Sequence, residues 1–334
     1  MEFNSKNEPS FLKVLNFLKT HDTEYLSGQD LSDVLRISRV AVWKSIKKIE
    51  ELGYKIETKQ KVGYKLVEKP KTIFPWELSS GLKTKFIGHA IYYFDEIDST
   101  QRFSHEIANK ENNGAVIIAT QQNSGKGRIG RKWVSRNGGI YFSAVLFPKF
   151  DISFATVFPM AASLALAKTI EKLCEIKPEL KWPNDVTIKG EKVAGILVDV
   201  SLQSNKIDYL ILGIGINFDI NEKEIQKELK KTPNFYGVKS LGEFSKNIKP
   251  IKFLQTLLKE IEAIYFELES KEIENIIKEW TKRSSTIGKN VKIPTEDGII
   301  QGKATKIEND GALVVENKKK STRVIAGDVV HLEK

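Results

Sequence analysis

The segment Gln122-Asn123-Ser124-Gly125-Lys126-Gly127-Arg128-Ile129-Gly130-Arg131-Lys132-Trp133 follows a run, 116–120, that is typical of a buried strand. Its three glycines let the backbone approach a ligand closely, and its four cations within seven positions can surround phosphate and carboxylate oxygens. The segment is neither a Walker loop, which requires Gly-Lys-Ser/Thr, nor the Gly-x-Gly-x-x-Gly opening of a dinucleotide site. It predicts either an anion-binding loop or a mobile basic surface loop.

Two further motifs favour the anion-binding interpretation. Lys181-Trp182-Pro183-Asn184-Asp185 precedes a buried-looking strand that Lys192 opens, and Gly213-Ile214-Gly215-Ile216-Asn217 ends another strand. A lysine in that position is unfavourable unless an anion meets it. Asp185, after a rigid Trp-Pro turn, is a candidate base or magnesium contact. Singly, these residues are ordinary edge, turn and bulge residues, but together they indicate a binding site.

Strand-like and helical runs alternate from about residue 84 to 282. The expected strands are 90–94, 116–120, 140–147, 193–200 and 209–216, and the expected helices are 155–174 and 253–269. Four short strands follow in residues 283–334, at 291–293, 300–307, 312–316 and 323–325. The pattern predicts an α+β multidomain protein with a central α/β domain over 84–282 and a small C-terminal β-barrel over 283–334.

The first 67 residues have a different pattern. Apolar residues at helical spacing from 11 to 52 predict three short helices, and two alternating runs around 54–58 and 62–66 predict a hairpin. Ser27 with Asp30 forms a capping box for the second helix, and Ser38 caps the third. The order predicts a winged helix-turn-helix over 1–67. Pro70 and Pro75 mark 68–83 as a linker.

The net charge of +10 is concentrated in this N-terminal region. Residues 38–65 hold eight lysines and arginines against three glutamates, which is half of the formal excess. Basic residues on a reading helix and a wing tip suit DNA phosphates and base edges, although a solvated basic face is the alternative. The candidate DNA-binding residues are Ser38, Arg39, Lys44, Lys47, Lys48, Lys59 and Lys61.

The composition of the chain argues against disulfide-bonded, zinc-binding and membrane-spanning proteins. The single Cys174 excludes an internal disulfide, and four scattered histidines offer no zinc-ligand spacing. We therefore predict no protein-held metal site, and expect any metal to be a hard ion that arrives with a nucleotide. The sequence has neither a signal-like N-terminus nor an apolar run long enough for a membrane span, so we expect a cytoplasmic protein with no membrane partner.

In this order the motifs resemble those of the biotin–protein ligases, and specifically of the bifunctional ligase-repressors known as biotin operon repressors. The resemblance covers nearly the whole chain and runs through Asp98-Ser99-Thr100, Gly125–Arg131, Lys181–Asp185, Lys192–Gly195 and Gly213–Asn217. It implies a class II synthetase-like catalytic domain and an SH3-like C-terminal barrel. It also implies formation of biotinyl-5'-AMP from biotin and ATP with Mg²⁺. Biotin would then pass to a lysine of a biotin carboxyl carrier protein, such as an acetyl-CoA carboxylase subunit. The adenylate-bound homodimer would repress biotin genes at an operator DNA.

The resemblance also implies residue roles. Biotin binding is implied for Ser99, Thr100, Gln101, Gln122, Lys126, Gly127, Arg128, Lys192 and Gly195. Adenylate binding is implied for Gly125, Lys126, Arg128, Arg131, Trp133, Lys192 and Asn217, and catalysis for Arg128, Lys192 and Asp185. Two residues depart from the family pattern. Gln101 replaces the usual Asn, and Lys126 replaces the usual Arg, which exchanges a bidentate fork for a point charge.

The chemistry of the reaction gives an independent reason for the cations. An anionic carboxylate must attack an anionic α-phosphate, so the site needs positive charge, which Lys126, Arg128 and Lys192 with Mg²⁺ would supply. The acceptor lysine must then lose its proton, and Asp185 is the candidate that orients or deprotonates it.

Two alternatives are open at this point. One is a related enzyme that acts on lipoate or octanoate, against which the whole-chain resemblance argues. The other is a transcription factor that keeps a ligase-like domain only as a biotin sensor. The intact cationic loop with Lys192 disfavours the second alternative, because a sensor need not bind ATP.

Overall fold

The computed structural model describes residues 2–3, 9–230, 232, 235–244, 247–295, 298–318 and 320–332. The chain forms two compact units. The smaller unit ends at Thr72, and the larger unit begins at Ile73 and also contains Glu2 and Phe3.

The smaller unit is a three-helix cluster with a two-stranded hairpin. Its elements are α1 (Ser10–Thr20), α2 (Gly28–Leu35), α3 (Arg39–Glu51), β2 (Lys55–Lys59) and β3 (Gly63–Glu68). The Ser27–Asp30 capping box is present, and the Ser38 side chain accepts a hydrogen bond from the Ala41 amide at 3.1 Å. Leu12, Leu31 and Ile46 are buried between the helices. These observations confirm the predicted helices, caps and hairpin.

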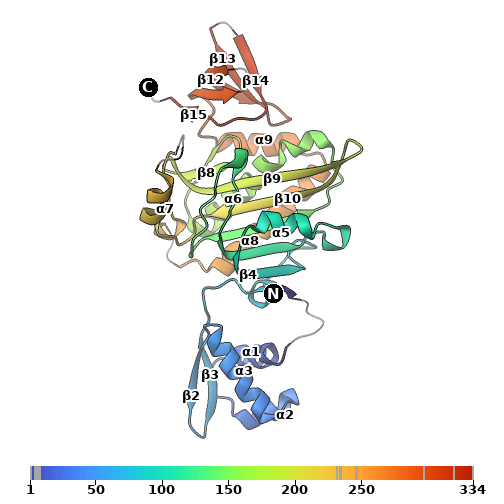
Figure 1. Ribbon diagram of the computed structural model, residues 1–334, viewed down its shortest axis with the longest axis vertical. Helices are drawn as coiled ribbons and strands as arrows, with labels where there is room; N and C mark the ends of the chain where they lie inside the picture. Colours follow the sequence, from blue (N-terminus) through green and yellow to red (C-terminus); the bar gives the residue numbers. More distant parts are fainter. Residues whose placement is uncertain are drawn as a thin grey trace. The chain divides into compact units, whose positions relative to one another are not determined.

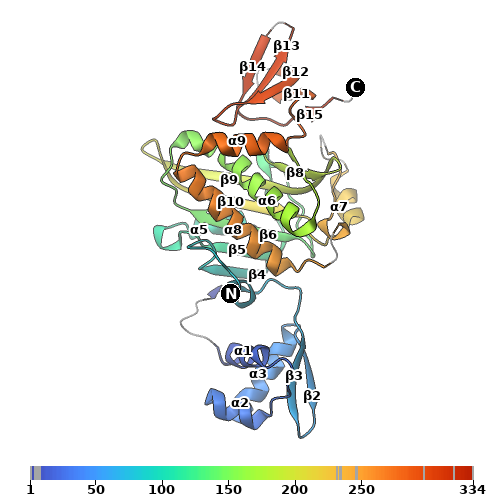
Figure 2. The ribbon, with the colours of Figure 1, turned by 180° about the vertical axis from the view of Figure 1, so that it is seen from behind.

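The larger unit is built on an eight-stranded sheet with the order β1-β4-β5-β6-β10-β9-β8-β7, in which β4 and β5 are parallel and the other pairs are antiparallel. Helices α6 and α8 cover one face of the sheet and α5 lies on the opposite face, as Figures 1 and 2 show. The strands are β1 (Glu2–Phe3), β4 (Ile91–Ile97), β5 (Val116–Gln122), β6 (Ile140–Leu146), β7 (Glu179–Lys181), β8 (Asp185–Ile188), β9 (Glu191–Gln203) and β10 (Lys206–Ile216). The helices are α4 (Pro75–Ser79), α5 (Thr100–Glu106), α6 (Phe158–Cys174), α7 (Glu222–Leu229), α8 (Pro250–Glu269) and α9 (Ile273–Lys282).

A second, five-stranded antiparallel sheet follows α9, with the order β14-β13-β12-β11-β15. Its strands are β11 (Asn290–Thr295), β12 (Gly298–Ile307), β13 (Leu313–Asn317), β14 (Lys320–Val324) and β15 (Val330–His331). Trp182, which follows β7 of the eight-stranded sheet, joins the two sheets, because its indole N–H donates to the Gly311 carbonyl at 2.9 Å. Short 3-10 turns complete the fold at Lys110–Asn112, Arg128–Gly130, Ile152–Ala155 and Leu241–Glu243.

The structure corrects the sequence interpretation in two places. Residues 68–83 are not simply a linker, because Pro75–Ser79 form helix α4, whose Trp76 and Leu78 are buried in the larger unit. Apolar side chains there find a partner in α8, which the breaking of periodicity by Pro70 and Pro75 did not reveal. Residues 1–67 are also not one body, because Glu2–Phe3 pair with β4.

Gly63 allows a test of whether the two units unfold separately. At φ +144°, a β-carbon on Gly63 would lie 2.2 Å from the Leu26 carbonyl oxygen. We expect Gly63→Ala to destabilise the smaller unit by about 1–3 kcal/mol. Amide hydrogen exchange should show faster opening of α1–α3 and unchanged protection of β5, β6 and β10. Gly190→Ala is the control, since φ is +79° there but no atom lies within 4 Å. Equal loss of protection in both units would contradict independent unfolding.

Candidate functional site

Where β9 and β10 pair, two facing glycines leave the surface of the sheet without side chains. We call this surface the glycine floor. Gly195 lies opposite Gly215 in the antiparallel register, and the Trp133 indole covers both glycines. A β-carbon would lie 2.3 Å from Trp133 Nε1 at Gly215 and 2.9 Å from Trp133 Cζ3 at Gly195. Such distances are not tolerated, so this pair of strands needs glycine at both positions to hold a flat group against the sheet.

The basic loop predicted from the sequence forms one wall of this cavity. Ile129 and Gly130 have positive φ values of 54° and 68°, which turn the chain sharply. Hydrogen bonds from the Gly127 amide to the Arg131 carbonyl, 2.6 Å, and from the Trp133 amide to the Gly125 carbonyl, 2.8 Å, close the loop. The turn leaves Ile129 in solvent and directs Arg128 and Arg131 into the cavity.

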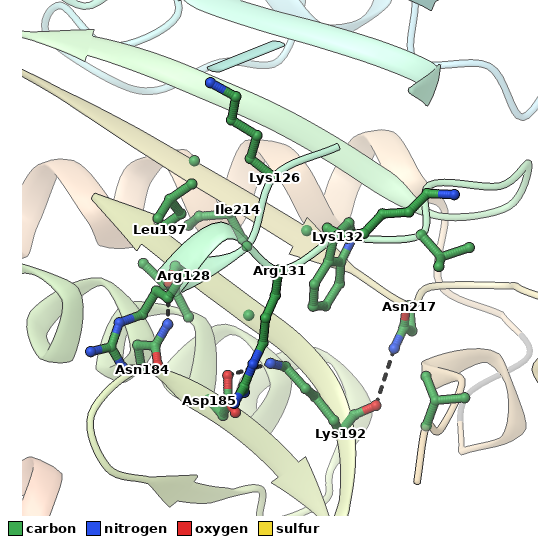
Figure 3. A pocket seen from close by; sticks show the side chains of 18 of the residues that line it. Lys126, Arg128, Arg131, Lys132, Asn184, Asp185, Lys192, Leu197, Ile214 and Asn217 are labelled. Atoms are coloured by element: carbon green, nitrogen blue, oxygen red, sulfur yellow. Dashed lines mark hydrogen bonds and ion pairs between the residues drawn. The ribbon is translucent and has the colours of Figure 1, made fainter. Parts of the chain in front are cut away.

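Cations lie beside carboxylates in the charged part of the cavity (Figure 3). Lys192 Nζ lies 2.5 Å from Asp185 Oδ1, and Arg131 pairs with Asp328 from the C-terminal sheet region. Arg128 donates to Asn184 Oδ1 at 3.2 Å. Burial lowers the pKa of the Arg128 guanidinium, while Asp328 and Asp185 raise it. Arginine nevertheless keeps its charge, so the cavity holds fixed positive charge.

Tyr236 and Lys181 complete the surroundings of Asp185. Tyr236 donates its hydroxyl to Asp185 Oδ2 at 2.5 Å, and burial, followed by the charge of Asp185, raises the pKa of Tyr236 well above its usual value. Lys181 Nζ lies 3.5 Å from the centre of the Tyr236 ring. Burial lowers the pKa of Lys181 to about 8. Both oxygens of Asp185 are therefore engaged.

The opposite end of the cavity is polar and uncharged. The Ser99 hydroxyl accepts from the Arg102 amide at 3.4 Å and caps α5. The Thr100 amide donates to Gln122 Oε1 at 2.8 Å, and the Thr100 and Ser143 hydroxyls lie 2.9 Å apart. Gln101 also faces this end. One cavity thus joins a hydrogen-bonding end to a cationic end.

The structure brings nearly all of the predicted ligase residues together. The lining includes Ser99, Thr100, Gln101, Gln122, Lys126, Gly127, Arg128, Arg131, Trp133, Asp185, Lys192, Gly195 and Asn217. Gly125 does not line the cavity. A β-carbon there would lie 2.5 Å from the Trp133 carbonyl oxygen, so Gly125 permits the loop closure instead. In Figure 3, Lys126 extends away from Asp185, whereas Arg131 and Lys192 point toward it.

The lining residues that the sequence interpretation did not assign to the site include Asn184, Tyr236 and Asp328. Asn184 stands within the Lys181–Asp185 motif and lies 7% exposed against Arg128, so the motif itself pointed to it. Tyr236 and Asp328 come from segments without any motif, and they reach the cavity through tertiary folding. Among the residues that the structure describes, no group of three His, Cys, Asp or Glu side chains could hold a metal ion.

The smaller unit presents a basic surface on α3. Lys47 and Lys48 pair with Glu50 and Glu51 at 2.8 and 3.3 Å, and Lys59 lies 3.8 Å from Glu57. The other cations of the predicted set, Arg39, Lys44 and Lys61, have no ion-pair partner within the described part of the chain.

The sequence interpretation missed two apolar residues on this surface. Val40 and Trp43 are 62% and 53% exposed, and with Lys44 and Lys47 they recur at helical spacing opposite the buried Val42 and Ile49. An exposed indole beside cations is suited to a nucleic-acid groove. No helix among the described residues is long and apolar enough to span a bilayer.

The fold and cavity define an anion-binding enzyme domain joined to a helix-turn-helix unit, and comparisons with known proteins specify the class. Three family models match: an HTH domain over residues 12–65, the biotin/lipoate A/B protein ligase family over 93–217, and the biotin protein ligase C-terminal domain over 286–332.

Relatives match over most of the chain. The bifunctional ligase/repressor BirA of Bacillus spizizenii is 33% identical over 92% of this chain and 94% of its own length. BirA of Escherichia coli is 26% identical, with 88% of each chain covered. A biotin protein ligase from Aquifex aeolicus, solved with biotin and ATP, aligns with a TM-score of 0.63 and 29% identity over 73% of this chain and 99% of that one. The chain therefore belongs to the biotin protein ligase family, in its bifunctional ligase/repressor group.

The position of Trp133 over the glycine floor generates a test. Trp133 Nε1 is buried and has no hydrogen-bond partner in the described structure, so the indole is held mainly by packing. We expect Gly215→Ala to expel the indole and shift its fluorescence to the red. The same substitution in a Trp133→Phe background should leave the emission of the other tryptophans unchanged. A red shift in both backgrounds would show that Gly215 supports the fold more widely.

Proposed function

We propose that this chain is a biotin–protein ligase that forms biotinyl-5'-AMP from biotin and ATP and transfers biotin to a lysine of a biotin carboxyl carrier protein. It also acts as a biotin-dependent transcriptional repressor of biotin genes. The observation that carries the ligase proposal is the single cavity that joins an uncharged hydrogen-bonding end to a cationic end. Biotin has a polar ring system at one end and a carboxylate at the other, which matches this arrangement.

In the first step, a biotin carboxylate oxygen bonds to the α-phosphorus of ATP, and the bond to pyrophosphate breaks. Arg128 and Lys126 offset the repulsion between the two anions. Lys192 exchanges Asp185 for phosphoryl oxygens, since a phosphate offers more negative charge than one carboxylate. Mg²⁺ enters as part of the MgATP substrate. Asp185 is an unsuitable ligand for it while Lys192 and Tyr236 occupy both carboxylate oxygens.

In the second step, the acceptor lysine attacks the acyl carbon and AMP leaves. Movement of Lys192 to the phosphate releases Asp185 Oδ1, which can then orient or deprotonate the incoming ammonium. Tyr236 keeps the carboxylate in place by donating to its other oxygen at 2.5 Å. Trp133 closes over the adenine side, and Arg131 and Asn217 contribute to adenylate binding.

Several finer assignments belong to this proposal. The larger sheet with its helices is a class II synthetase-like domain, and the five-stranded C-terminal sheet is an SH3-like barrel. With the correction for α4, the catalytic domain extends from residue 73 to 282 and the C-terminal domain from 283 to 334. The chain acts in the cytoplasm, where ATP, the acceptor and DNA are available.

The two activities are linked through dimerisation. A helix-turn-helix monomer reads one half-site, whereas a dimer reads two and gains affinity from the pairing. The adenylate orders the basic loop and its neighbours and so favours a homodimer that binds operator DNA. This dimer competes with the acceptor protein for one face, so repression follows only when acceptor lysines are filled.

Labelled biotin transfer to an apo carboxyl carrier domain with ATP and Mg²⁺ tests the ligase function. Transfer is expected with biotin, and lipoate or octanoate should not replace it. Preferred use of lipoate or octanoate would support the rival enzyme. Biotin binding without any ATP-dependent product would support a sensor.

Lys192 should act on activation more than on biotin binding. We expect Lys192→Ala to slow adenylate formation on the order of 100-fold, with a much smaller change in biotin affinity, because its partner is charge on phosphorus. Lys189→Ala is the matched control, since Lys189 is exposed in the same hairpin. Rapid-quench formation of adenylate and calorimetric biotin binding provide the two measurements. Equal damage to both would place Lys192 at the ring or carboxylate instead.

Substitutions on the surface of α3 should change DNA binding in two distinguishable ways. For a site selected by the full chain from random duplexes, Trp43→Ala should weaken binding by about 1–3 kcal/mol through loss of base contacts. Lys44→Ala should lower the slope of log affinity against log salt by about one. Lys13→Ala is the control, because Lys13 is exposed on α1 and lies outside the predicted DNA-binding set. Unchanged DNA affinity of the Trp43→Ala variant would contradict the role of α3 in base recognition.

A further inference from the structure

Two residues outside the cavity lining connect to Gln101. His105 follows on α5, and Asp199 lies on β9 opposite Ile211 of β10. Asp199 Oδ2 accepts from Gln101 Nε2 at 3.0 Å and lies 3.1 Å from His105 Nε2. His105 Nδ1 lies 3.3 Å from the Tyr209 hydroxyl. A partly exposed pair is thus joined to a buried residue of the ligand site.

The amide of Gln101 is held in one orientation. Its nitrogen donates to Asp199 and, at 3.2 Å, to the Ile211 carbonyl, so both amide hydrogens are engaged. Its oxygen accepts from the Ser143 hydroxyl at 3.0 Å. The side chain is 3% exposed, and Gly213 provides room for it, since a β-carbon there would lie 2.4 Å from the oxygen.

Asp199 determines which way the side-chain amide of Gln101 is oriented. An ionised carboxylate can only accept, so both His105 Nε2 and Gln101 Nε2 must donate to it. Reversal of the Gln101 amide would place its oxygen against the Asp199 carboxylate and the Ile211 carbonyl. Two acceptor–acceptor contacts would result, and each is unfavourable in a buried site. The cavity therefore meets the carbonyl oxygen of Gln101 and not its NH₂ group.

Of the two side-chain amides Gln101 and Gln122, Gln101 has an oxygen that can accept a further hydrogen bond. Gln122 Oε1 already accepts from the Thr100 amide at 2.8 Å and from the Thr100 hydroxyl at 3.1 Å. Gln101 Oε1 accepts from Ser143 within the described structure and retains a second lone pair. A ligand with N–H donors can use that lone pair.

We propose that Asp199 and His105 are positioning residues that hold the Gln101 carbonyl oxygen toward the cavity and so set the affinity for a ligand that presents N–H groups. The inference rests on the proposed function, under which that ligand group is the ureido ring of biotin. Neither residue touches the ligand, and both act through Gln101.

The test compares steady-state constants of the full chain. Asp199→Leu removes the acceptor and should raise the KM for biotin about tenfold or more, with kcat at saturating biotin and the KM for ATP within about twofold. Asp199→Asn keeps an acceptor for Gln101 and should restore the KM for biotin to within about threefold. Dethiobiotin, which keeps the ureido group, should lose affinity by the same factor as biotin. Arg102→Ala is the control on α5, where Arg102 forms an exposed pair with Asp98.

A double-mutant cycle decides whether Asp199 acts through Gln101. In a Gln101→Ala background, Asp199→Leu should change the KM for biotin less than twofold, because the group it positions is gone. Fully additive effects, or a KM for biotin unchanged by Asp199→Leu, would overturn the proposal. If Asp199→Leu fails to fold, Asp199→Ala replaces it in the cycle. A parent protein that neither binds nor transfers biotin would refute the proposed function itself, which is a different outcome from a working parent with an unaffected variant.

Discussion

The register of β9 against β10 is the constraint on which the site depends. Because Gly195 faces Gly215 across the pair, this part of the sheet has no side chains on the cavity side. A slip by one residue would turn every side chain of β9 to the other face and fill the cavity with Ala194 or Ile196. The same register sets Asp199 opposite Ile211, where both can hold Gln101. The floor and the polar end of the cavity are therefore consequences of one strand pairing.

Charge balance explains how the cationic end persists without ligand. Asp185 and Asp328 pair with Lys192 and Arg131, so the cations are held at the cavity without uncompensated burial. These pairs are intramolecular substitutes for the anions that the enzyme handles. A polyphosphate that enters the cavity exchanges one set of partners for another, which lets the cations be in place before the reaction begins. Asp328 also makes the C-terminal sheet region part of the catalytic wall.

Local patterns in the sequence were sufficient for the helix caps, for most strands of the large sheet and for a set of ligase residues of which all but Gly125 line the cavity. The motif residues lie next to the strand ends that carry them, so short-range order was enough to find Arg128, Asp185 and Lys192. Tyr236 and Asp328 could not be predicted, because they reach the cavity from segments that no motif marks. The pairing of Glu2–Phe3 with β4 is similarly non-local. Val40 and Trp43 were not predicted, because the sequence interpretation of α3 rested on its basic residues alone.

The central claim is that the cavity joins biotin to AMP. The most direct measurement is mass spectrometry of the products that the full chain forms from biotin and MgATP without any acceptor protein. The account predicts pyrophosphate and one equivalent of biotinyl-5'-AMP that stays with the protein. Formation of ADP and phosphate, or of no biotin-dependent nucleotide product at all, would contradict it.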